Sequence, residues 1–491
     1  MQTKIDISDK NILLLGYGAV AKCVWNYFDH YFHYDQNRVF AVDQFQSSFT
    51  GPRVELLQCM VEHISATTFD TVLDTIGMTT GDIIIDLTYD SATYYFIKRS
   101  LERGIHYMNT SIEDRTDVFH GSSIAVQQHH VGEIMRQFES EHPYTSTILT
   151  ECGQNPGVIQ HYVFHALDCM NQLSAQPLLI PLSQPEQATR MNFYREIIRQ
   201  FQVGTIFCSE MDDQVMDIPI NPDVITNTWS VSGFLSEAMD PTEVVRSTSN
   251  PFIQPVIAEE MRYTTRMQLY PYAKEEPYEV VFLKEMGVHT TIPSICPVIT
   301  PQGIAYKTYQ GKMIHHGELF DLARHFGKDT PFMSYVYQNN PYMDQSLHHF
   351  FSTRPDATPT DIIMYANQEH HFRVLDQREG NITGQDSIGA TLFCGKEKID
   401  RIFWCGSIVT HTDANLQPYF TPTIIQVAAG VLSGLSYIME QPRLGWLQSS
   451  DIDTTYMLEK CKPLLGSFFF TEIPVAEFTE SLTITTRKSF V

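Results

Sequence analysis

Short apolar runs alternate with helical patterns over the first 155 residues. Buried strands are predicted at 11–16, 39–43, 82–87, 105–109 and 145–150, and amphipathic helices at 20–28, 94–103 and about 126–141. Segment 54–64 fits either a strand or a helix. Strands that alternate with helices pair in parallel through right-handed crossovers, so this part predicts an α/β fold with a Rossmann-type doubly wound sheet.

The pattern changes after Pro156. A helix is predicted at about 158–170, and short strands such as 278–283 and 390–394 follow among frequent prolines. This mixture of a helix, short strands and prolines indicates a second, α+β domain. The run 423–440 predicts a strong helix whose small residues favour close packing, and we expect it to return to the first domain. The predicted domains are therefore 1–157, 158–419 and a C-terminal helical segment, 420–491, on the first domain.

A glycine-rich turn joins the first predicted strand to the first helix. Its residues are Gly16, Tyr17, Gly18, Ala19, Val20 and Ala21, a GxGxxA pattern. The first glycine permits a tight turn, the second lets a pyrophosphate approach the backbone, and the alanine allows close helix–sheet packing. Asp43 ends the second predicted strand, where a carboxylate accepts ribose hydroxyls. No Lys or Arg follows in residues 44–46, so we expect NAD rather than NADP. A glycine turn without a ligand is the alternative.

Polar residues follow three further predicted strands. Asp90, Glu113 and Asn155 come after the strands at 82–87, 105–109 and 145–150. Because the carboxyl ends of parallel strands face one crevice, these side chains are predicted to share a site. Each one taken singly is more often a helix cap or a turn residue.

The second domain contains an acidic and aromatic pattern. Glu210 lies close in sequence to Asp212 and Asp213, and Trp229 precedes Glu237 by eight residues in a polar setting. An indole face can hold an ammonium group, with an energy of about 0.5–2 kcal/mol. The alternative is that Trp229 is an ordinary core residue.

Composition narrows the classes of function. The chain has 491 residues, with 33 Lys and Arg against 57 Asp and Glu, for a net charge of −24. This balance argues against a nucleic-acid partner and fits a cationic substrate, although an acidic surface alone would explain it. Nine cysteines without a CxxC pair fit reduced thiols in a cytoplasm. No metal-binding spacing, secretory signal or membrane-spanning run is recognised, so we expect no metal site and no membrane.

Several segments together resemble the bacterial homospermidine synthases, whose fold is similar to that of saccharopine dehydrogenases. The most specific are NTWSVSGFLSEAM at 227–239 and the NPG element at 155–157. The others include LLLGYGAVAK, NTSIED, MIHHGE, QDSIGATLF, FWCGSIVT and the long C-terminal helix. The resemblance covers most of the chain.

The resemblance implies an NAD-dependent transferase that joins two putrescines into homospermidine and releases ammonia. Bound NAD would be a recycled hydride carrier: one amine is oxidised to an imine, a second amine condenses with it, and the new Schiff base is reduced. It further implies a homodimer and a cytoplasmic location. Spermidine is a further possible substrate.

The resemblance also implies roles for individual residues. Gly16, Gly18, Ala19, Val20 and Asp43 would hold NAD. Asp90, Glu113 and Asp386 would bind substrate, and Glu210, Trp229, Glu237, Asn155 and His315 would be catalytic. The segments FTPTIIQ at 420–426 and 263–276 depart from the family pattern, which leaves the preferred diamine open.

Two other functions remain open. The first is an amino-acid oxidoreductase of the saccharopine or carboxynorspermidine type, whose carboxylate substrate calls for an arginine clamp. Arg190 and Arg195 are candidates, but they lie in a helix-like stretch away from the acids. The second is a non-catalytic NAD-binding sensor, since a fold does not fix a function.

Overall fold

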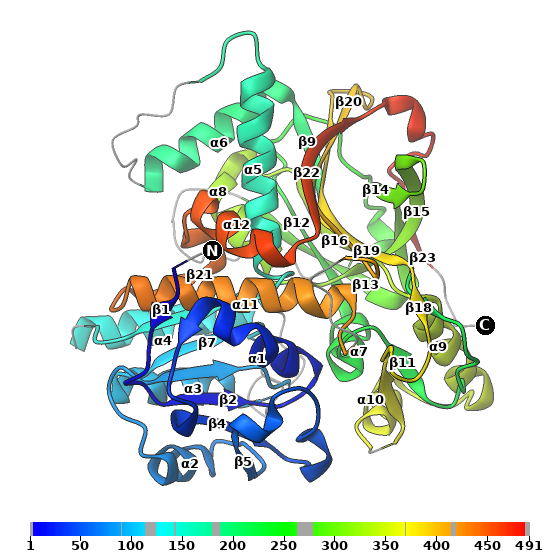
Figure 1. The fold of residues 1–491 in the computed structure, drawn as a ribbon. Coiled ribbons are helices and arrows are strands. Elements are labelled where there is room, and N and C mark those ends of the chain that lie inside the picture. Colours follow the sequence, from blue (N-terminus) through cyan, green and yellow to red (C-terminus); the bar gives the residue numbers. More distant parts are fainter. Residues whose placement is uncertain are drawn as a thin grey trace. The chain divides into compact units, whose positions relative to one another are not determined.

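A computed structural model describes residues 3–89, 91–112, 124–141, 144–178, 187–262, 278–368, 370–413 and 419–486. The chain forms two compact units (Figure 1). The first comprises Met1–Val158, Asp376–Arg378 and Ala414–Leu464. The second comprises Ile159–Leu375, Glu379–Asp413 and Leu465–Val491.

The first unit is built on a seven-stranded sheet in which every pair of neighbours is parallel. In spatial order its strands are β21 (Gly445–Gln448), β8 (Thr147–Thr150), β7 (His106–Asn109), β6 (Ile83–Asp86), β2 (Ile12–Leu15), β4 (Val39–Asp43) and β5 (Gln58–Val61). The doubly wound arrangement predicted from the sequence is confirmed. The ambiguous segment 54–64 becomes a short 3₁₀ turn, Val54–Leu56, followed by the exposed edge strand β5.

Helices of the first unit are α1 (Ala19–Tyr31), α2 (Phe69–Ile76), α3 (Thr93–Arg103), α4 (Ile124–Glu141), α11 (Pro422–Glu440) and α12 (Thr454–Cys461). The returning C-terminal helix is confirmed as α11, which packs along this unit (Figure 1). Its small residues permit this packing: a Cβ on Gly430 would lie 2.0 Å from the carbonyl oxygen of Gly153. Among the described helices, α11 alone has the length and composition of a membrane span, and 83% of its apolar window is buried, as in a core helix.

The second unit contains a ten-stranded mixed sheet. Its main path is β22 (Ser467–Ile473), β20 (Arg401–Thr410), β19 (Gln385–Cys394), β9 (Val203–Asp212), β16 (Phe332–Gln338), β15 (Gly303–Ile314), β14 (Thr290–Thr300) and β23 (Thr485–Thr486). Strands β12 (Pro241–Arg246) and β13 (Glu279–Met286) extend it beside β16. The pair β9–β16 is parallel and the other pairs are antiparallel.

Helices α5 (Val158–Leu173), α6 (Gln187–Phe201), α7 (Val231–Ala238), α8 (Glu318–Phe326), α9 (Pro341–Thr353) and α10 (Pro359–Ala366) complete this unit. Two short strand pairings also belong to this unit: β10 (Val215–Met216) with β18 (Ile382–Thr383), and β11 (Ile225–Asn227) with β17 (Phe372–Val374). A third, β1 (Ile5–Asp6) with β3 (Phe32–His33), belongs to the first unit. The predicted α+β character of the second domain is confirmed.

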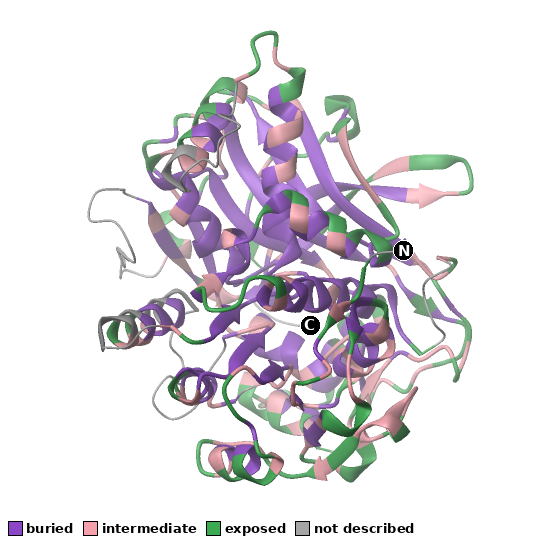
Figure 2. Ribbon diagram, turned by 60° about the vertical axis from the view of Figure 1, so that its left-hand side comes forward, coloured by how far each residue is buried: buried purple, intermediate pink, exposed green. Residues whose placement is uncertain are grey.

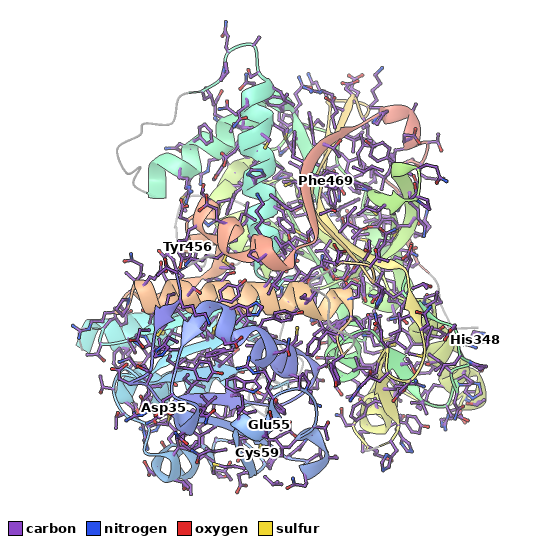
Figure 3. All side chains as sticks on the ribbon, viewed as in Figure 1. Asp35, Glu55, Cys59, His348, Tyr456 and Phe469 are labelled. Carbon is purple, nitrogen blue, oxygen red and sulfur yellow. The ribbon has the colours of Figure 1, made fainter. Side chains whose placement is uncertain are left out.

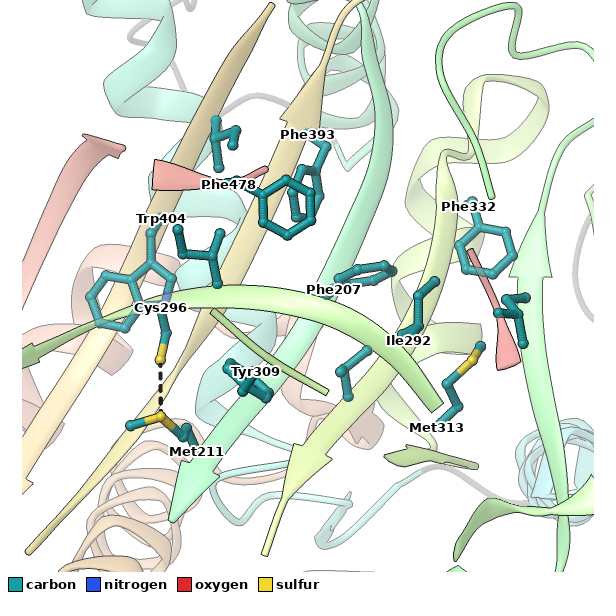
Figure 4. Packing of buried hydrophobic residues seen from close by; sticks show 14 of the residues in the cluster. Phe207, Met211, Ile292, Cys296, Tyr309, Met313, Phe332, Phe393, Trp404 and Phe478 are labelled. Atoms are coloured by element: carbon teal, nitrogen blue, oxygen red, sulfur yellow. Dashed lines mark hydrogen bonds between the residues drawn. The ribbon is translucent and has the colours of Figure 1, made fainter. Parts of the chain in front are cut away.

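The two faces of the ten-stranded sheet differ in chemistry. One face carries an apolar cluster that includes Phe207, Met211, Phe332 and Trp404 (Figure 4). In this cluster the Cys296 thiol lies 3.7 Å from the Met211 sulfur. Because side chains alternate along a strand, Glu210 on β9 points to the opposite face from its neighbour Met211. The strands β9 and β19 are buried along their whole length (Figure 2).

The C-terminal part of the chain differs from the prediction of a helical segment at 420–491. After α11 it adds β21 to the edge of the first sheet, and after α12 it adds β22 to the edge of the second. Phe469 of β22, which Figure 3 labels, packs against Trp404 with ring centroids 5.2 Å apart. These strands are short, and partners far away in the sequence stabilise them, so local periodicity does not reveal them.

All nine cysteines lie within the described residues and are free thiols. Seven of them are buried, Cys169 is partly buried, and Cys59 on the edge strand β5 is exposed (Figure 3). No cysteine therefore contributes a covalent cross-link to either core.

Candidate active site

The glycine turn lies between β2 and α1 in the first unit. Gly16 has φ +77°, and a Cβ there would lie 3.1 Å from the Leu87 carbonyl oxygen, so the turn itself requires glycine. Gly18 is different: among the described residues, a Cβ there would meet no atom within 4 Å. The absence of a side chain at Gly18 therefore leaves open space at the start of α1, where Ala19 and Val20 form the first turn. This is the geometry that admits a pyrophosphate at a helix N-terminus.

Asp43 stands at the carboxyl end of β4, next to this turn. Its carboxylate accepts hydrogen bonds from the backbone N–H of Tyr17 at 2.8 Å, from the backbone N–H of Phe45 at 3.0 Å and from the Ser48 hydroxyl at 2.8 Å. Asp43 therefore fixes the conformation of the turn and also places a carboxylate where an adenosine ribose would lie. These residues fit a dinucleotide.

Lys22 on α1 supplies a cation that the sequence after Asp43 lacks. Its ammonium group donates to the Thr50 hydroxyl at 3.3 Å and lies 5.9 Å from the centre of the Tyr17 ring. Burial lowers the pKa of Lys22, while the nearby carboxylate of Asp43 opposes that shift. Sequence analysis did not identify this residue because its position relative to Asp43 depends on how α1 packs.

A buried polar network occupies the carboxyl ends of β6, β7 and β8. The Tyr107 hydroxyl donates to Asp86 at 2.6 Å, and Asn109 accepts a hydrogen bond from the backbone N–H of Glu151 at 2.9 Å. Gln128 donates to the Glu151 carboxylate at 2.7 Å. Burial raises the pKa of Asp86. Polar groups do gather at this edge, but the ones the structure describes differ from those that the sequence singled out.

Asp90 and Glu113, the predicted substrate-binding residues, lie outside the described residues, as does segment 263–276. Asn155 is described and lies, partly buried, in a tight turn closed by a hydrogen bond of 2.9 Å from the Gly153 N–H to the Pro156 carbonyl. Gly157 in this turn has φ +142°, and a Cβ there would lie 2.0 Å from the Gly153 carbonyl oxygen. The NPG element therefore shapes the backbone that presents Asn155.

The polar face of the second sheet holds most of the other predicted residues. Glu210 on β9 is the register partner of Tyr337 on β16 and of Ile388 on β19, and Asp212 is the partner of Asp386. Residues opposite each other in neighbouring strands share a face, so these carboxylates and the tyrosine lie on one side of the sheet. Glu210, Asp212, Tyr337 and Asp386 are all buried.

Two tyrosines on β16 connect this face to the predicted catalytic residues. The Tyr335 hydroxyl donates to Glu210 at 2.6 Å. The indole N–H of Trp229 donates to the Tyr337 hydroxyl at 3.3 Å. Trp229 itself is only partly buried, immediately before α7, and Gly233 on that helix lies against its ring. Trp229 is thus part of a polar cluster with an incompletely covered indole.

His316 joins two further carboxylates to the cluster. One ring nitrogen lies 3.2 Å from Glu237 on α7 and the other lies 3.0 Å from Glu318 at the start of α8. The imidazole stacks on the Tyr335 ring at a centroid distance of 3.9 Å. His315, the histidine predicted from the resemblance, is buried next to it, but His316 is the residue that bridges the two glutamates.

The protonation states of this cluster follow from its charges and its burial. Burial alone would lower the pKa of His316, but Glu318 and Glu237 outweigh it, so the pKa lies well above its ordinary value and the ring is a cation. Burial raises the pKa of Asp212 to about 6, although hydrogen bonds from Thr228 and Gln214 oppose this shift. Burial, followed by the charge of Glu210, raises the pKa values of Tyr335 and Tyr337.

Of this cluster, the sequence predicted the carboxylates of Glu210, Glu237 and Asp386 as site residues, whereas Glu318, His316 and the two tyrosines were missed. The alternation Tyr335–Val336–Tyr337 in a buried strand was the available signal, because it places both rings on one face. The cluster combines several carboxylates, one imidazolium and one indole. Such a set can bind an organic cation and hold or release a proton, and no group of metal-ligating side chains occurs among the described residues.

Comparisons with known proteins bear on both units. Residues 12–143 match the family model of the saccharopine dehydrogenase NADP binding domain. The homospermidine synthase of Mesorhizobium japonicum is 24% identical over 469 residues, which cover 93% of this chain and 88% of that protein. The homospermidine synthase of Blastochloris viridis is 23% identical over 467 residues, which cover 93% and 90%. The chain is similar to homospermidine synthases along nearly its whole length.

A solved structure shows the same likeness in three dimensions. The homospermidine synthase of Legionella pneumophila, determined in complex with NAD, has a TM-score of 0.75 at 19% identity and covers 96% of this chain and 92% of that one. This likeness establishes the fold. The resemblance inferred from the sequence motifs is confirmed, and so is the predicted fold class. The roles of single residues stay predictions.

Proposed function

We propose that this chain is an NAD-dependent homospermidine synthase, which converts two putrescines into homospermidine and ammonia. The observation that carries the proposal is the cluster of Glu210, Trp229, Glu237 and His316 in a chain whose other unit has a dinucleotide-binding turn. The relatives that match most of the chain are named homospermidine synthases, and one was solved with NAD. When bound, NAD would accept a hydride from an amine and return it to an imine.

The glycine turn and Asp43 would hold the dinucleotide. Open space over Gly18 accommodates the pyrophosphate, and Asp43 accepts from the ribose.

The acidic cluster would bind the amine. Putrescine carries two ammonium groups near neutral pH, since alkyl amines of this type have pKa values of about 10.4. The exposed part of the Trp229 indole would hold one ammonium group, and Glu210 and Glu237 would bind amines and exchange protons with them. An amine must lose a proton before hydride can leave the adjacent carbon, so a carboxylate near the ammonium group serves both binding and chemistry.

The amino-acid oxidoreductase alternative lacks support in the cluster. In the part of the chain that the structure describes, Glu237 and Glu318 form ion pairs with His316 and with no lysine or arginine. Arg195 belongs to α6 and donates to the backbone carbonyl of His325 at 3.1 Å. A carboxylate substrate would meet negative groups here, whereas a diamine meets complementary charge.

The decisive experiment is to incubate the purified protein with putrescine and substoichiometric NAD⁺ and to quantify products by mass spectrometry. Homospermidine formed in molar excess over NAD is the expected result. NADH formed in proportion to NAD without any triamine would contradict the proposal. NAD binding without turnover of any diamine would instead indicate the sensor function.

The assembly and location of the protein are further parts of this proposal. We expect a homodimer, because two-fold dimers are the commonest assembly and the resemblance implies one. Light scattering of the purified chain tests this expectation. We also expect a cytoplasmic enzyme.

A further inference from the structure

Neither the sequence motifs nor the comparisons assign a role to Tyr335. Tyr335 and Glu210 are both buried, on adjacent parallel strands, and the phenol donates to the carboxylate at 2.6 Å. A hydrogen bond this short between a phenol and a carboxylate is typical of a charge-assisted bond. The Glu210 carboxylate is therefore held by a specific donor in a position that water hardly reaches.

The ring of Tyr335 is itself held in place. His316 stacks on it at 3.9 Å with an interplanar angle of 25°, and His316 is fixed in turn by Glu237 and Glu318. The centroid of the Tyr337 ring lies 6.0 Å from that of the Tyr335 ring, and the angle between the two ring planes is 26°. A cation stacked on a phenol withdraws electron density from the ring, which makes the hydroxyl a stronger donor.

We propose that Tyr335 is a positioning residue that keeps Glu210 ionised and oriented for the amine. The identity of the amine in this inference rests on the proposed function, whereas the ionisation state of Glu210 does not depend on it. A donor to the charged form of a carboxylate favours ionisation, and a buried carboxylate that lacks such a donor shifts toward the neutral form. A neutral Glu210 could neither attract an ammonium group nor accept a proton from it.

Other groups around Glu210 also affect its ionisation, and the experiment must separate them from Tyr335. The titratable side chains that face the Glu210–Tyr335 pair from the neighbouring elements are Asp212, Tyr337, Asp386, Glu237 and His316. Asp212 and Asp386 are like charges that favour protonation of Glu210, whereas the His316 cation favours its ionisation. None of them changes in a Tyr335→Phe variant.

Tyr335→Phe removes the hydroxyl and keeps the ring on which His316 stacks. We expect the acid limb of the kcat/KM profile for putrescine to move upward by about one to two pH units, the size expected when a carboxylate loses a strong donor. Above the displaced limb, kcat should return to within a few-fold of wild type with little change in KM, since Tyr335 would not touch the substrate. A loss of activity that is equal at every pH would overturn the proposal.

Tyr309→Phe is the matched control. Tyr309 is buried in the apolar cluster of the same sheet, so the variant also deletes one buried phenol hydroxyl. Its pH profile should coincide with that of wild type. Equal displacements in both variants would show that the effect is general and would contradict the specific role of Tyr335.

Two further measurements keep the inference testable apart from turnover. Because Tyr335 would act through Glu210, the Tyr335→Phe/Glu210→Gln double variant should be no slower than Glu210→Gln alone, and additive losses would contradict the proposal. Infrared difference spectra against Glu210→Gln identify the protonated Glu210 carboxyl band without any diamine. As pH is lowered, that band should appear at a higher pH in Tyr335→Phe than in wild type. If the band titrates at the same pH in both proteins, the inference is wrong even if homospermidine is made. Absence of triamine from wild type would instead reject the proposed function alone.

Discussion

In the second unit, a few side chains bring together charges that would each be unfavourable if buried alone. Glu237 and Glu318 are held on either side of His316, whose cation offsets part of their charge. The indole N–H of Trp229 donates to the Tyr337 hydroxyl at 3.3 Å, and Trp229 is only partly buried. At the residue scale, the cluster is therefore complementary to an organic cation, and Trp229 and Glu237 are its partly buried members.

Trp229 offers the most direct residue-scale test. Trp229→Ala removes the indole face, and loss of a desolvated cation–π contact of about 2 kcal/mol would lower kcat/KM for putrescine by roughly 30-fold. Trp229→Phe should retain part of the activity. Trp446→Phe, which alters another partly buried tryptophan that donates to Thr150 at 3.0 Å, is the control. If all these variants match wild type in steady-state kinetics, the Trp229 indole serves only for packing.

Asp212 should make the stability of the protein depend on pH. Its folded pKa of about 6 lies above the ordinary value of 3.8, so the folded state binds a proton more tightly than the unfolded state. The free energy of unfolding of wild type relative to Asp212→Asn should therefore fall by up to about 3 kcal/mol as pH rises from about 4 to about 6. Above pH 6 this difference should stay constant.

Denaturant unfolding of the two proteins across this pH range measures the difference. Asp400→Asn, which removes a half-exposed carboxylate from the same unit, controls for the loss of a surface charge. A stability difference that stays constant between pH 4 and 6, or that changes in the opposite direction, would mean that Asp212 is not neutral in the folded protein at low pH.

At the scale of elements, the strand–turn–helix at the start of the chain contains two glycines that serve different purposes. Gly16 is required by the backbone, whereas a Cβ at Gly18 would lie more than 4 Å from the described atoms outside its own turn. Asp43 connects β4 to this turn through the Tyr17 N–H. The element is therefore rigid in the absence of a ligand and open on the side that a dinucleotide would approach.

Substitution at these two glycines should give opposite outcomes. Gly18→Ala adds a methyl group that touches no protein atom, so the thermal midpoint without cofactor should stay close to that of wild type. The Kd for NAD should nevertheless rise by about tenfold or more, because the methyl occupies the phosphate side of the turn. Gly16→Ala should lower the thermal midpoint, since φ +77° is strained for alanine. Unchanged NAD affinity in calorimetry of Gly18→Ala would exclude this turn as the pyrophosphate site.

At the scale of the whole molecule, net charge sets how the substrate is encountered. The chain carries −24 at pH 7, and the buried cluster adds negative groups close to the proposed amine site. A negative field concentrates dications and raises their association rate, and added salt screens that field. The same field gives no such advantage to a neutral compound.

Raising ionic strength from about 0.01 to about 1 M shortens the screening length from roughly 30 to roughly 3 Å. We therefore expect kcat/KM for putrescine to fall several-fold over this range, while kcat at saturating diamine changes little. Steady-state kinetics at fixed, saturating NAD provides the measurement. A salt-independent kcat/KM would show that long-range attraction plays no part in diamine capture.

The five inner strands of the first sheet could be predicted because their signals are local, whereas the edge strands β5 and β21 could not. The strand at Val39–Asp43, the helix after Gly18 and the helix Pro422–Glu440 each carry their own periodicity, cap or glycine, so few alternatives compete. The acids Glu210 and Glu237 could be proposed as site residues because they lie in the acidic and aromatic pattern around Trp229 and in motifs that resemble the homospermidine synthases.

Only the tertiary structure decided how these pieces combine. Tyr335 reaches Glu210 because β16 pairs in parallel with β9 in one register, and His316 rather than His315 meets two glutamates because α7 and α8 flank it. Likewise, β21 and β22 join different sheets although few residues separate them. Such contacts depend on pairing between distant segments, and local sequence carries no record of the partner or the register.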